Sequence, residues 1–412
     1  MDKEIGIYIH IPFCKSKCYY CDFNSYAGME SLAGPYFHAL YGEVEDMAGL
    51  LDARPVKSIF IGGGTPSLVE PGYISRLLEV CLKYYKIKND AEISMESNPG
   101  TLSYEALKSY RAAGVNRLSI GLQAWQDRLL KKMGRIHNRR QFIDNFEAAY
   151  KAGFRNINVD LIFGLPGQSF EDWAETLEAV TALGLGAGLR HLSCYSLQIE
   201  EGTVLDGLLK KGALEPADDE LDREMYGYTV SELAGKGYRH YEISNFAEPG
   251  FECRHNLIYW KALEYAGFGA GAHSYLDGKR FNNVYGIGQY IEAVKHRSIN
   301  ETGMNEGENT PDINGPGGSL HENIQPISRK EAMDEYMMLG FRLIDGVTAE
   351  EFEVRFGEKL PAIYGRRLKK LIKEGLIEGI SSNTASSGAA YDRFRLTKSG
   401  LDLANRVFEE FL

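Results

Sequence analysis

The chain has 412 residues, 44% of them hydrophobic and 25% charged, which is long enough for two or three domains and a large core. Its formal net charge of −11 argues against nucleic acid as a general partner, because phosphate binding needs a basic surface. We see no secretory signal and no apolar run of membrane-spanning length, and the cysteines are clustered, so we expect a cytoplasmic protein that uses its thiols for metal.

The cysteine cluster follows a short apolar run near the start of the chain. Residues 5–11 alternate as in a strand, and Pro12 ends the run. The loop that follows contains Cys14, Cys18 and Cys21. Three thiolates can hold a 4Fe-4S cluster by three of its irons, and no fourth cysteine lies nearby to close it. The open iron would take the amino and carboxylate groups of S-adenosylmethionine (SAM), whose reductive cleavage gives a 5′-deoxyadenosyl radical.

Other interpretations of the cysteines stay open at this point. A zinc site with a remote fourth ligand is the alternative, although zinc knuckles favour pairs of C-x2-C, and only one such pair is present. Cys81, Cys194 and Cys253 are most simply packing thiols. Because Cys194 falls in a predicted strand, it could instead line a cavity.

A repeated strand-then-helix pattern fills the first half of the chain. Strands are predicted over residues 5–11, 57–61, 91–96, 117–122, 156–163 and 190–196. Helical periodicity separates them, for example over 73–85, 104–112, 141–152 and 170–183. This alternation predicts an α/β fold with a parallel sheet, either a partial (β/α)6 barrel or a flat doubly wound sheet. In both architectures the functional site lies past the carboxyl ends of the strands.

Glycines and polar residues follow the predicted strands at those ends. The second strand leads into the run 62–66, GGGTP, whose glycines let backbone amides approach a ligand. The ends of later strands and the segments after them carry polar residues, namely Glu96, Asn98, Gln123, Arg135, Asp160, Tyr195 and Ser196. Several polar ends that face one cavity beside a cysteine cluster predict a site, whereas a single one usually caps a helix. His10 alternates with Tyr8 on the first strand, so both point at the cavity, with His10 in a supporting role.

The strand-helix pattern ends near residue 206, and an α+β segment follows. A helix is predicted over 221–236, and the alternating glycines of 267–274 suit a strand pressed against a ligand or another backbone. His255, close to Tyr259 and Trp260, could ligate a haem or porphyrin between flat apolar surfaces. The residue chemistry alone favours a hydrogen-bonded core histidine instead, and the same holds for His273.

The remainder of the chain divides into a linker and a small terminal unit. Residues 296–325 are rich in Gly, Asn, Glu and Pro and lack an apolar period, so we expect a linker or mobile loop. Helices over 330–343, 349–356 and 362–374, strands over 376–378 and 393–396, and a final helix over 399–411 indicate a winged-helix-like domain. Its short basic run at 366–370 is interpreted as a solvated helix face. The predicted domains are 1–205, 206–295, the linker 296–328, and 329–412.

Taken together, these residues resemble the radical SAM superfamily and, within it, the coproporphyrinogen III oxidase-like branch, closest to the haem chaperone family HemW. The resemblance covers nearly the whole chain. It is carried by YIHIPFC with the two cysteines that follow, GGGTP, ESNP, SIGLQ, GRIH, VDLIFGLPGQ, HNLIYW, GFGAGAHS and RLTKSG. The cysteine spacing with GGGTP is specific for the superfamily, and HNLIYW with GFGAGAHS is specific for the branch.

The resemblance implies a role for each matching position. It implies that Cys14, Cys18 and Cys21 ligate a 4Fe-4S cluster. The residues that it implies for SAM binding are Tyr8, Gly63, Gly64, Thr65, Glu96, Gln123, Arg135 and Asp160. His255 matches the haem-binding position of the chaperone family, which outweighs the estimate from residue chemistry alone. The implied cofactors are therefore a 4Fe-4S cluster, SAM and haem.

Two departures separate the chain from the oxygen-independent oxidase that gives the branch its name. Phe23 stands where the oxidase carries a fourth cysteine, and thirteen residues precede Cys14 where the oxidase has a long segment reaching its active site. Both departures put decarboxylation in doubt, so we expect a haem chaperone, with a radical SAM decarboxylase of porphyrin biosynthesis as the alternative.

The chaperone interpretation implies particular partners. They are haem or porphyrin, haem-accepting proteins of which respiratory, membrane-bound ones are examples, and an electron donor to the cluster. Nucleic acid is not among them. A peripheral contact with a membrane stays open, although no basic amphipathic stretch argues for one.

Overall fold

The structure is a computed structural model that describes residues 4–51, 54–301, 320–381 and 391–412, without the side chains of 297–301. The chain forms two compact units. The first consists of Met1–Glu232 and Glu264–Pro326, and the second of Leu233–Leu263 and Ile327–Leu412. The domain boundaries predicted at 205, 295 and 328 are not tested by this division and stay predictions. Within the described residues, no helix is both long and apolar enough to span a membrane.

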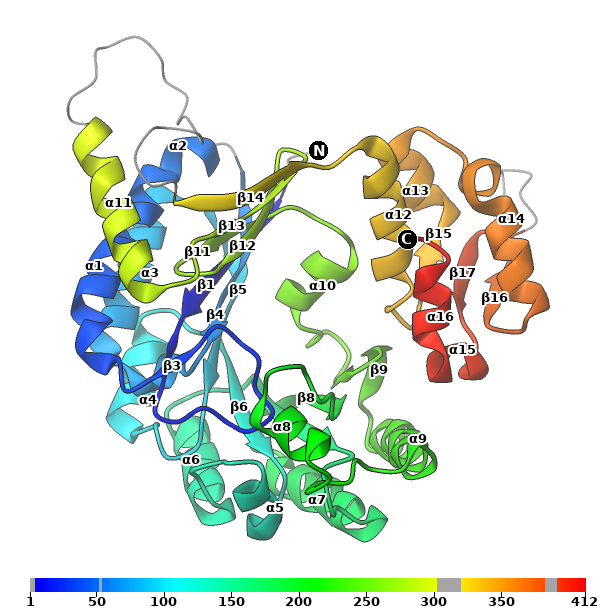
Figure 1. Ribbon diagram of the computed structural model, residues 1–412, viewed down its shortest axis with the longest axis horizontal. Helices are drawn as coiled ribbons and strands as arrows, with labels where there is room; N and C mark the ends of the chain where they lie inside the picture. The colour runs from blue at the N-terminus through cyan, green and yellow to red at the C-terminus, as the bar shows by residue number, and fades with distance from the viewer. Residues whose placement is uncertain (1–3, 52–53, 302–319, 382–390) are drawn as a thin grey trace. The chain divides into compact units, whose positions relative to one another are not determined.

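Six parallel strands form the centre of the first unit. They are β1 (Ile5–Ile11), β4 (Val56–Gly63), β5 (Ile87–Ser97), β6 (Arg117–Gln123), β7 (Ile157–Phe163) and β8 (Leu189–Ser196). Each pairs in parallel with the next in chain order, and Figure 1 shows them fanning out as a partial barrel. A doubly wound sheet would reverse its strand order at a switch point, and this one does not. The predicted partial (β/α)6 barrel is therefore confirmed.

Helices that connect these strands cover one face of the sheet. They include α1 (Ala33–Asp46), α3 (Pro71–Tyr84), α4 (Tyr104–Ala112), α6 (Arg139–Lys151) and α7 (Phe170–Gly184). Figure 1 shows α1, α3, α4 and α6 side by side, and each contacts the next. Their sequences explain where they begin, since Ser103, Asn138 and Ser169 cap three of them through side-chain hydrogen bonds. Cys81 is buried on the apolar side of α3, as a packing thiol should be.

Shorter elements complete this unit. They are β2 (Phe13–Cys14), β3 (Tyr26–Ala27), η1 (Glu30–Leu32), α2 (Ala48–Leu51), η2 (Pro66–Leu68), α5 (Asp127–Lys132) and α8 (Val204–Lys210). The helix predicted over 221–236 is α9 (Asp219–Gly235).

An extension of the sheet lies beside β1. Its strands are β11 (Tyr265–Phe268), which is parallel to β1, and the antiparallel β12 (His273–Leu276), β13 (Lys279–Asn283) and β14 (His321–Pro326). The single strand predicted over 267–274 is wrong, because the chain turns between β11 and β12. Gly269 makes this turn with a φ of +93°, and a Cβ there would lie 2.6 Å from the His10 carbonyl oxygen.

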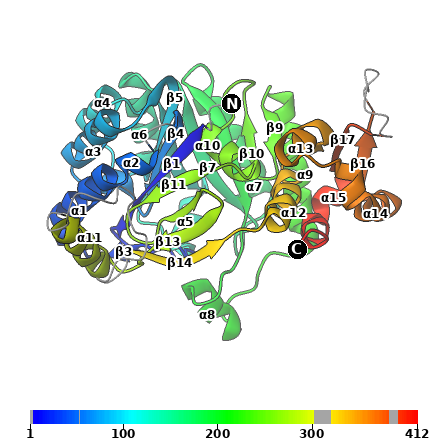
Figure 2. The same ribbon diagram turned by 90° about the horizontal axis from the view of Figure 1, so that it is seen from above.

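The predicted linker, 296–328, begins and ends in regular structure. Its start lies in α11 (Ile287–Glu301) and its end contains β14, while residues 302–319 lie outside the described residues. Ile287, Tyr290 and Val294 are buried at helical spacing, which explains why α11 packs beside α1 in both views (Figures 1 and 2).

The second unit contains the predicted winged-helix-like domain. The helices of the whole second unit are α10 (Arg254–Trp260), α12 (Arg329–Gly340), α13 (Ala349–Phe356), α14 (Leu360–Lys373), α15 (Lys398–Asp402) and α16 (Ala404–Glu409). Its strands are β9 (Arg239–Glu242), β10 (Asn245–Ala247), β15 (Val347–Thr348), β16 (Ile377–Ile380) and β17 (Arg393–Leu396). The single final helix predicted over 399–411 is wrong, because Leu403, at φ −119° and ψ 32°, interrupts it.

A buried carboxylate joins the extension to α1. Glu43 on α1 is 1% exposed and accepts hydrogen bonds from Gly269 N at 2.8 Å and Asn283 Nδ2 at 2.6 Å. It also accepts one from the Tyr290 hydroxyl of α11 at 2.5 Å. These donors come from the turn, β13 and α11, so a single side chain holds three separate segments against α1.

We predict that Glu43→Ala lowers the free energy of the first unfolding transition by about 3 kcal/mol, because three buried donors lose their acceptor. Urea unfolding followed by circular dichroism measures this change. The control is Glu45→Ala, an exposed position on the same helix, which should stay within about 0.5 kcal/mol of the parent protein. Equal losses in the two variants would contradict the role assigned to Glu43.

Candidate functional site

The three clustered cysteines lie in the loop that follows β1. The short parallel pair of β2 with β3 closes this loop, and Tyr26 N donates to the Pro12 carbonyl at 2.8 Å. All three thiols are free and partly buried, and a turn from Cys21 N to Cys18 O, at 3.2 Å, brings the last two close together. Burial raises the pKa of the Cys21 thiol, and the neighbouring thiols add to this effect.

The backbone after β4 packs directly against the cysteine loop. Gly64 N donates to the Ile11 carbonyl and Thr65 N to the Phe13 carbonyl, each at 2.8 Å. Both acceptors flank Pro12, so the loop starts on the edge of β4. The N–H groups of Gly64 and Thr65 are therefore bound within the protein, and the predicted contact of this run with a ligand stays a prediction.

Gly63 combines a positive φ with a lack of room for a side chain. Its φ is +108°, and a Cβ there would lie 2.4 Å from the His10 imidazole. Its N–H donates to Glu96 Oε2 at 3.0 Å. Gly63 on β4 therefore lies in direct contact with His10 on β1 and with the Glu96 carboxylate on β5.

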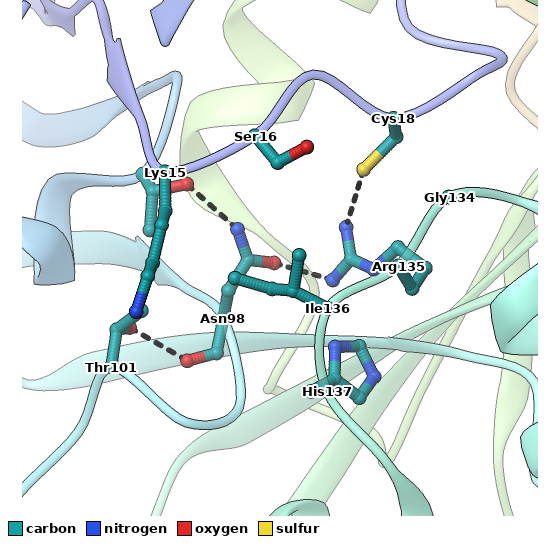
Figure 3. A pocket seen from close by; sticks show the side chains of 10 residues that line it. Lys15, Ser16, Cys18, Asn98, Thr101, Gly134, Arg135, Ile136 and His137 are labelled. Atoms are coloured by element: carbon teal, nitrogen blue, oxygen red, sulfur yellow. Dashed lines mark hydrogen bonds between the residues drawn. The ribbon is translucent and has the colours of Figure 1, made fainter. Parts of the chain in front are cut away.

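A chain of hydrogen bonds links Cys14 to Cys18. The Thr65 hydroxyl lies 3.6 Å from Cys14 Sγ and accepts from Asn98 Nδ2 at 2.8 Å. Arg135 Nη2 donates to Asn98 Oδ1 at 2.6 Å, and Nη1 lies 3.5 Å from Cys18 Sγ (Figure 3). The path therefore runs from one thiol to the other through side chains that follow β4, β5 and α5, and Arg135 donates to the sulfur of Cys18.

Arg135 has further partners that fix its orientation. Its Nη2 also donates to the Gly121 carbonyl at 2.7 Å, and Nη1 lies 3.4 Å from the Tyr20 hydroxyl. Gln123 lies beside this group, because a Cβ at Gly121 would be 2.9 Å from Gln123 Nε2. Gln123 has a φ of +72°, a conformation that is uncommon for residues with a side chain and that clusters at functional sites.

A second polar set surrounds Asp160 on β7. Asp160 Oδ2 accepts from the Ser119 hydroxyl at 2.7 Å, and Oδ1 accepts from Asn158 Nδ2 at 2.8 Å. His191 Nδ1 in turn contacts Asn158 Oδ1 at 2.6 Å. Each carboxylate oxygen of Asp160 is thereby fixed by one donor and keeps a lone pair for a ligand.

Glu96 has a different environment, in which its charge is less well compensated. Burial, and then repulsion from Asp160, raise the pKa of Glu96 to about 7, while the Gly63 N–H and Arg117 oppose this rise. A carboxylate in this state gains most from a cation placed beside it. SAM carries two cationic groups, its ammonium and its sulfonium, so the Glu96 carboxylate suits this ligand.

His10 connects the first strand to the end of the cysteine loop. Its Nε2 contacts the Asn24 carbonyl at 2.7 Å and its Nδ1 contacts the Tyr8 hydroxyl at 2.9 Å. Burial lowers the pKa of His10, so the ring is neutral. Because the carbonyl can only accept, Nε2 carries the proton and Nδ1 accepts from Tyr8. This geometry fits the supporting role predicted for His10.

The remaining candidates make their hydrogen bonds and packing contacts outside these polar sets. Ser196 Oγ donates to Asp222 Oδ2 at 2.6 Å and does not join the polar sets above. Cys194 is buried and aligned with Leu161, as expected for a packing thiol. His273 contacts the Tyr285 hydroxyl at 3.2 Å.

His255 belongs to the second unit and is described separately. It lies in the first turn of α10, is 1% exposed, and its Nε2 contacts the Tyr259 hydroxyl at 2.9 Å. The two rings meet edge to face with centroids 5.0 Å apart. On the same helix, Trp260 lies under the Arg342 guanidinium at 4.3 Å. The segment HNLIYW therefore forms nearly two helical turns, in which a buried imidazole contacts the ring of Tyr259.

The donor set was tested for its fit to an iron-sulfur cluster. Among the described residues, no three His, Cys, Asp or Glu side chains are gathered closely enough for a single metal ion. A single zinc ion holds each thiolate at about 2.3 Å, whereas a cluster spreads its thiolates over separate irons. Three free thiols in one loop, with hydrogen-bond donors aimed at two of them, fit the cluster.

Sequence reasoning missed several residues that complete this arrangement. Tyr20, Ser119 and Asn158 were not predicted, and Asn98 was noted only as a strand-end residue. Asn158 could have been found, because it lies two residues before Asp160 on a strand and so shares its face. Ser119 could not have been found in this way. Its contact with Asp160 depends on the register of β6 against β7, in which Gly121 pairs with Asp160.

Comparisons with known proteins agree with this geometry. A model of the Radical SAM superfamily matches residues 8–180, and a model described as the HemN C-terminal domain matches 327–383. The solved structure of coproporphyrinogen III oxidase (HemN) from Escherichia coli shares the fold, with a TM-score of 0.80 at 22% identity over 100% of this chain and 90% of that one. Fold, thiols and family model together define a radical SAM protein.

The curated relatives narrow this class further. The chain is 38% identical to the heme chaperone HemW of Bacillus subtilis (strain 168) over 98% of both chains. It is 32% identical to the heme chaperone HemW of Escherichia coli (strain K12) over 99% of this chain and 98% of the relative. The protein therefore belongs to the HemW family.

We predict that Gly63→Ala lowers the free energy of unfolding by about 2 kcal/mol or more, because the new methyl group meets His10 and the backbone has a positive φ. The control is Gly72→Ala in α3, where only one atom lies within 4.0 Å, and this change should stabilise the helix slightly. Urea unfolding of both variants measures the difference, and equal stabilities would refute the close approach at Gly63.

Proposed function

We propose that the protein is a haem chaperone of the radical SAM class, which binds haem, a 4Fe-4S cluster and SAM and delivers haem to acceptor haem proteins. The observation that carries the proposal is the identity over nearly the full chain to relatives named heme chaperone HemW. The proposal includes a cytoplasmic location, acceptors among which are membrane-bound respiratory proteins, and an electron donor for the cluster.

In this proposal the first unit holds the cluster and SAM. Cys14, Cys18 and Cys21 ligate three irons, and the donors from Thr65 and Arg135 adjust the charge on two of the sulfurs. When bound, a cluster and SAM supply reductive cleavage of the sulfonium, which is a source of the 5′-deoxyadenosyl radical.

The residues at the strand ends then take the separate parts of SAM. Glu96, with the acceptors of the run from Gly63 to Thr65, binds the ammonium group, because the amides of that run are already used. Asp160 binds the ribose hydroxyls with the lone pairs that Ser119 and Asn158 leave free. Three further proposed contacts surround the ligand, namely Tyr8, Gln123 and Arg135.

The second unit supplies the haem ligand in this proposal. His255 Nε2 is held by the Tyr259 hydroxyl, and an iron at this nitrogen would replace that hydrogen bond. Apolar aromatic surface beside an imidazole suits a porphyrin ring. Trp260 and Tyr259 provide this surface from the same helix.

A second candidate function is oxidative decarboxylation of a coproporphyrinogen propionate to a vinyl group. The whole-chain fold match to HemN favours it. Against it stands Phe23, which occupies the position of the oxidase's fourth cysteine and has 59% of its surface exposed. The two candidates differ in whether a porphyrin product accumulates.

We predict that SAM binding tightens as the pH rises through about 7, because only the deprotonated Glu96 carboxylate attracts the cation and its pKa is raised to about 7. In Glu96→Gln the affinity at high pH falls about 10- to 100-fold, and its pH dependence flattens. Calorimetric titration of the anaerobic, cluster-loaded protein measures both effects. The control is Glu70→Gln at the exposed start of α3, and an identical pH profile in all three proteins would remove Glu96 from the site.

We predict that His255→Gln weakens haem binding at least about tenfold, since glutamine cannot replace an imidazole as an iron ligand. Titration with haem, followed at the Soret band, measures the affinity. The control is His240→Gln in the same unit, whose Nε2 contacts the Ile243 carbonyl at 3.2 Å and which should bind haem as the parent does. Equal affinity of the parent and His255→Gln would overturn the assignment.

A further inference from the structure

A strongly basic segment lies beside the cysteine loop in an otherwise acidic protein. Residues 128–140, RLLKKMGRIHNRR, contain six arginines and lysines and no acidic residue, while the whole chain carries a net charge of −11. The segment covers most of α5, the connection that follows, and the start of α6. Such a concentration of one sign creates a local potential opposite to that of the whole molecule.

Some of these charges are already compensated. Arg128 pairs with Asp172, Arg140 pairs with Asp144, and Arg135 is part of the site described above. Lys131 and Lys132, by contrast, are exposed and form no ion pair within the described residues. The same is true of Lys15 at the start of the cysteine loop. Three uncompensated ammonium groups are therefore presented to solvent.

Direct contacts bring the basic segment and the cysteine loop together. Tyr19 N donates to the Met133 carbonyl at 3.0 Å, and a Cβ at Gly134 would lie 2.6 Å from the Tyr19 ring. Lys15, Cys18 and Ile136 line one pocket together with Arg135 (Figure 3). Lys15 therefore lies beside one of the thiols, and Lys131 and Lys132 immediately precede the residues that contact the cysteine loop.

Large apolar side chains are exposed in the same place. Tyr19 is 38% exposed, Ile136 54% and Phe23 59%, although each is of a type usually buried. Lys17 Nζ donates to the Phe23 carbonyl at 2.7 Å, which fixes this end of the loop. Exposed apolar side chains close to charged ones are a composition found in protein interfaces.

We propose that residues 15–23 of the cysteine loop and the basic segment, residues 128–140, form the docking surface for an acidic one-electron carrier protein. The inference rests on the proposed function, because the carrier serves the cluster that the three thiols would hold. In the exchange the carrier is oxidised by one electron and the cluster is reduced by one. Lysines attract an acidic partner, and the exposed apolar side chains of Tyr19, Phe23 and Ile136 offer it apolar contacts.

Binding of an acidic flavodoxin to the full chain tests the surface directly. We expect the affinity, measured by biolayer interferometry, to fall as salt rises from about 20 to about 300 mM. At low salt, Lys131→Glu/Lys132→Glu should weaken binding about tenfold or more. The matched control, Lys86→Glu/Lys108→Glu, makes the same charge change just before β5 and on α4, at exposed lysines away from the thiols, and should change the affinity less than about twofold. Equal weakening in the two double variants would overturn the proposal.

Reduction kinetics separate this inference from the proposed function. Flavodoxin hydroquinone should bleach the cluster more slowly in Lys131→Glu/Lys132→Glu than in the control, while photoreduced 5-deazaflavin, a small uncharged reductant, should bleach both at one rate. If flavodoxin acts equally on both variants while 5-deazaflavin still reduces the cluster, the docking surface is overturned and the proposed function is kept. A protein that takes up no cluster would overturn both.

Discussion

The backbone contact between the end of β1 and the glycine run after β4 is the constraint on which the site depends. Parallel strands end on the same edge of a sheet, and here their hydrogen bonding continues past that edge, from Gly64 to Ile11 and from Thr65 to Phe13. The continuation places the cysteine loop over the strand ends. A side chain at residue 63 would collide with His10 and separate the two segments.

Once the loop is in place, the polar residues of the other strands acquire distinct roles. The two carboxylates differ because Asp160 has a side-chain donor for each oxygen, while Glu96 has one backbone donor and is repelled by Asp160. The Asp160 carboxylate is held in position by its two donors, and the charged form of Glu96 is stabilised when a cation lies beside it. Asn98 and Arg135 connect the residues that contact two of the thiols, so these side chains form one hydrogen-bonded network.

Local patterns predicted most of the barrel, because buried parallel strands alternate with amphipathic helices and each leaves a signal within about ten residues. The cysteine spacing and the strand-end polar residues likewise located the candidate site. The errors arise where distant residues decide the structure. Gly269 turns because it meets the backbone of β1 and the carboxylate of Glu43, and β14 forms because His321 meets Asn283. Neither contact is visible in the local sequence.

The two functions that share this site differ in what happens to a porphyrin. The most direct measurement is anaerobic incubation of the cluster-loaded protein with SAM, a strong reductant and coproporphyrinogen III, with mass spectrometry for tri- and dicarboxylate products. The account predicts an intact cluster and no accumulating product, because the protein carries haem and does not make its precursor. Accumulation of these products over many turnovers would contradict the haem chaperone and establish a decarboxylase.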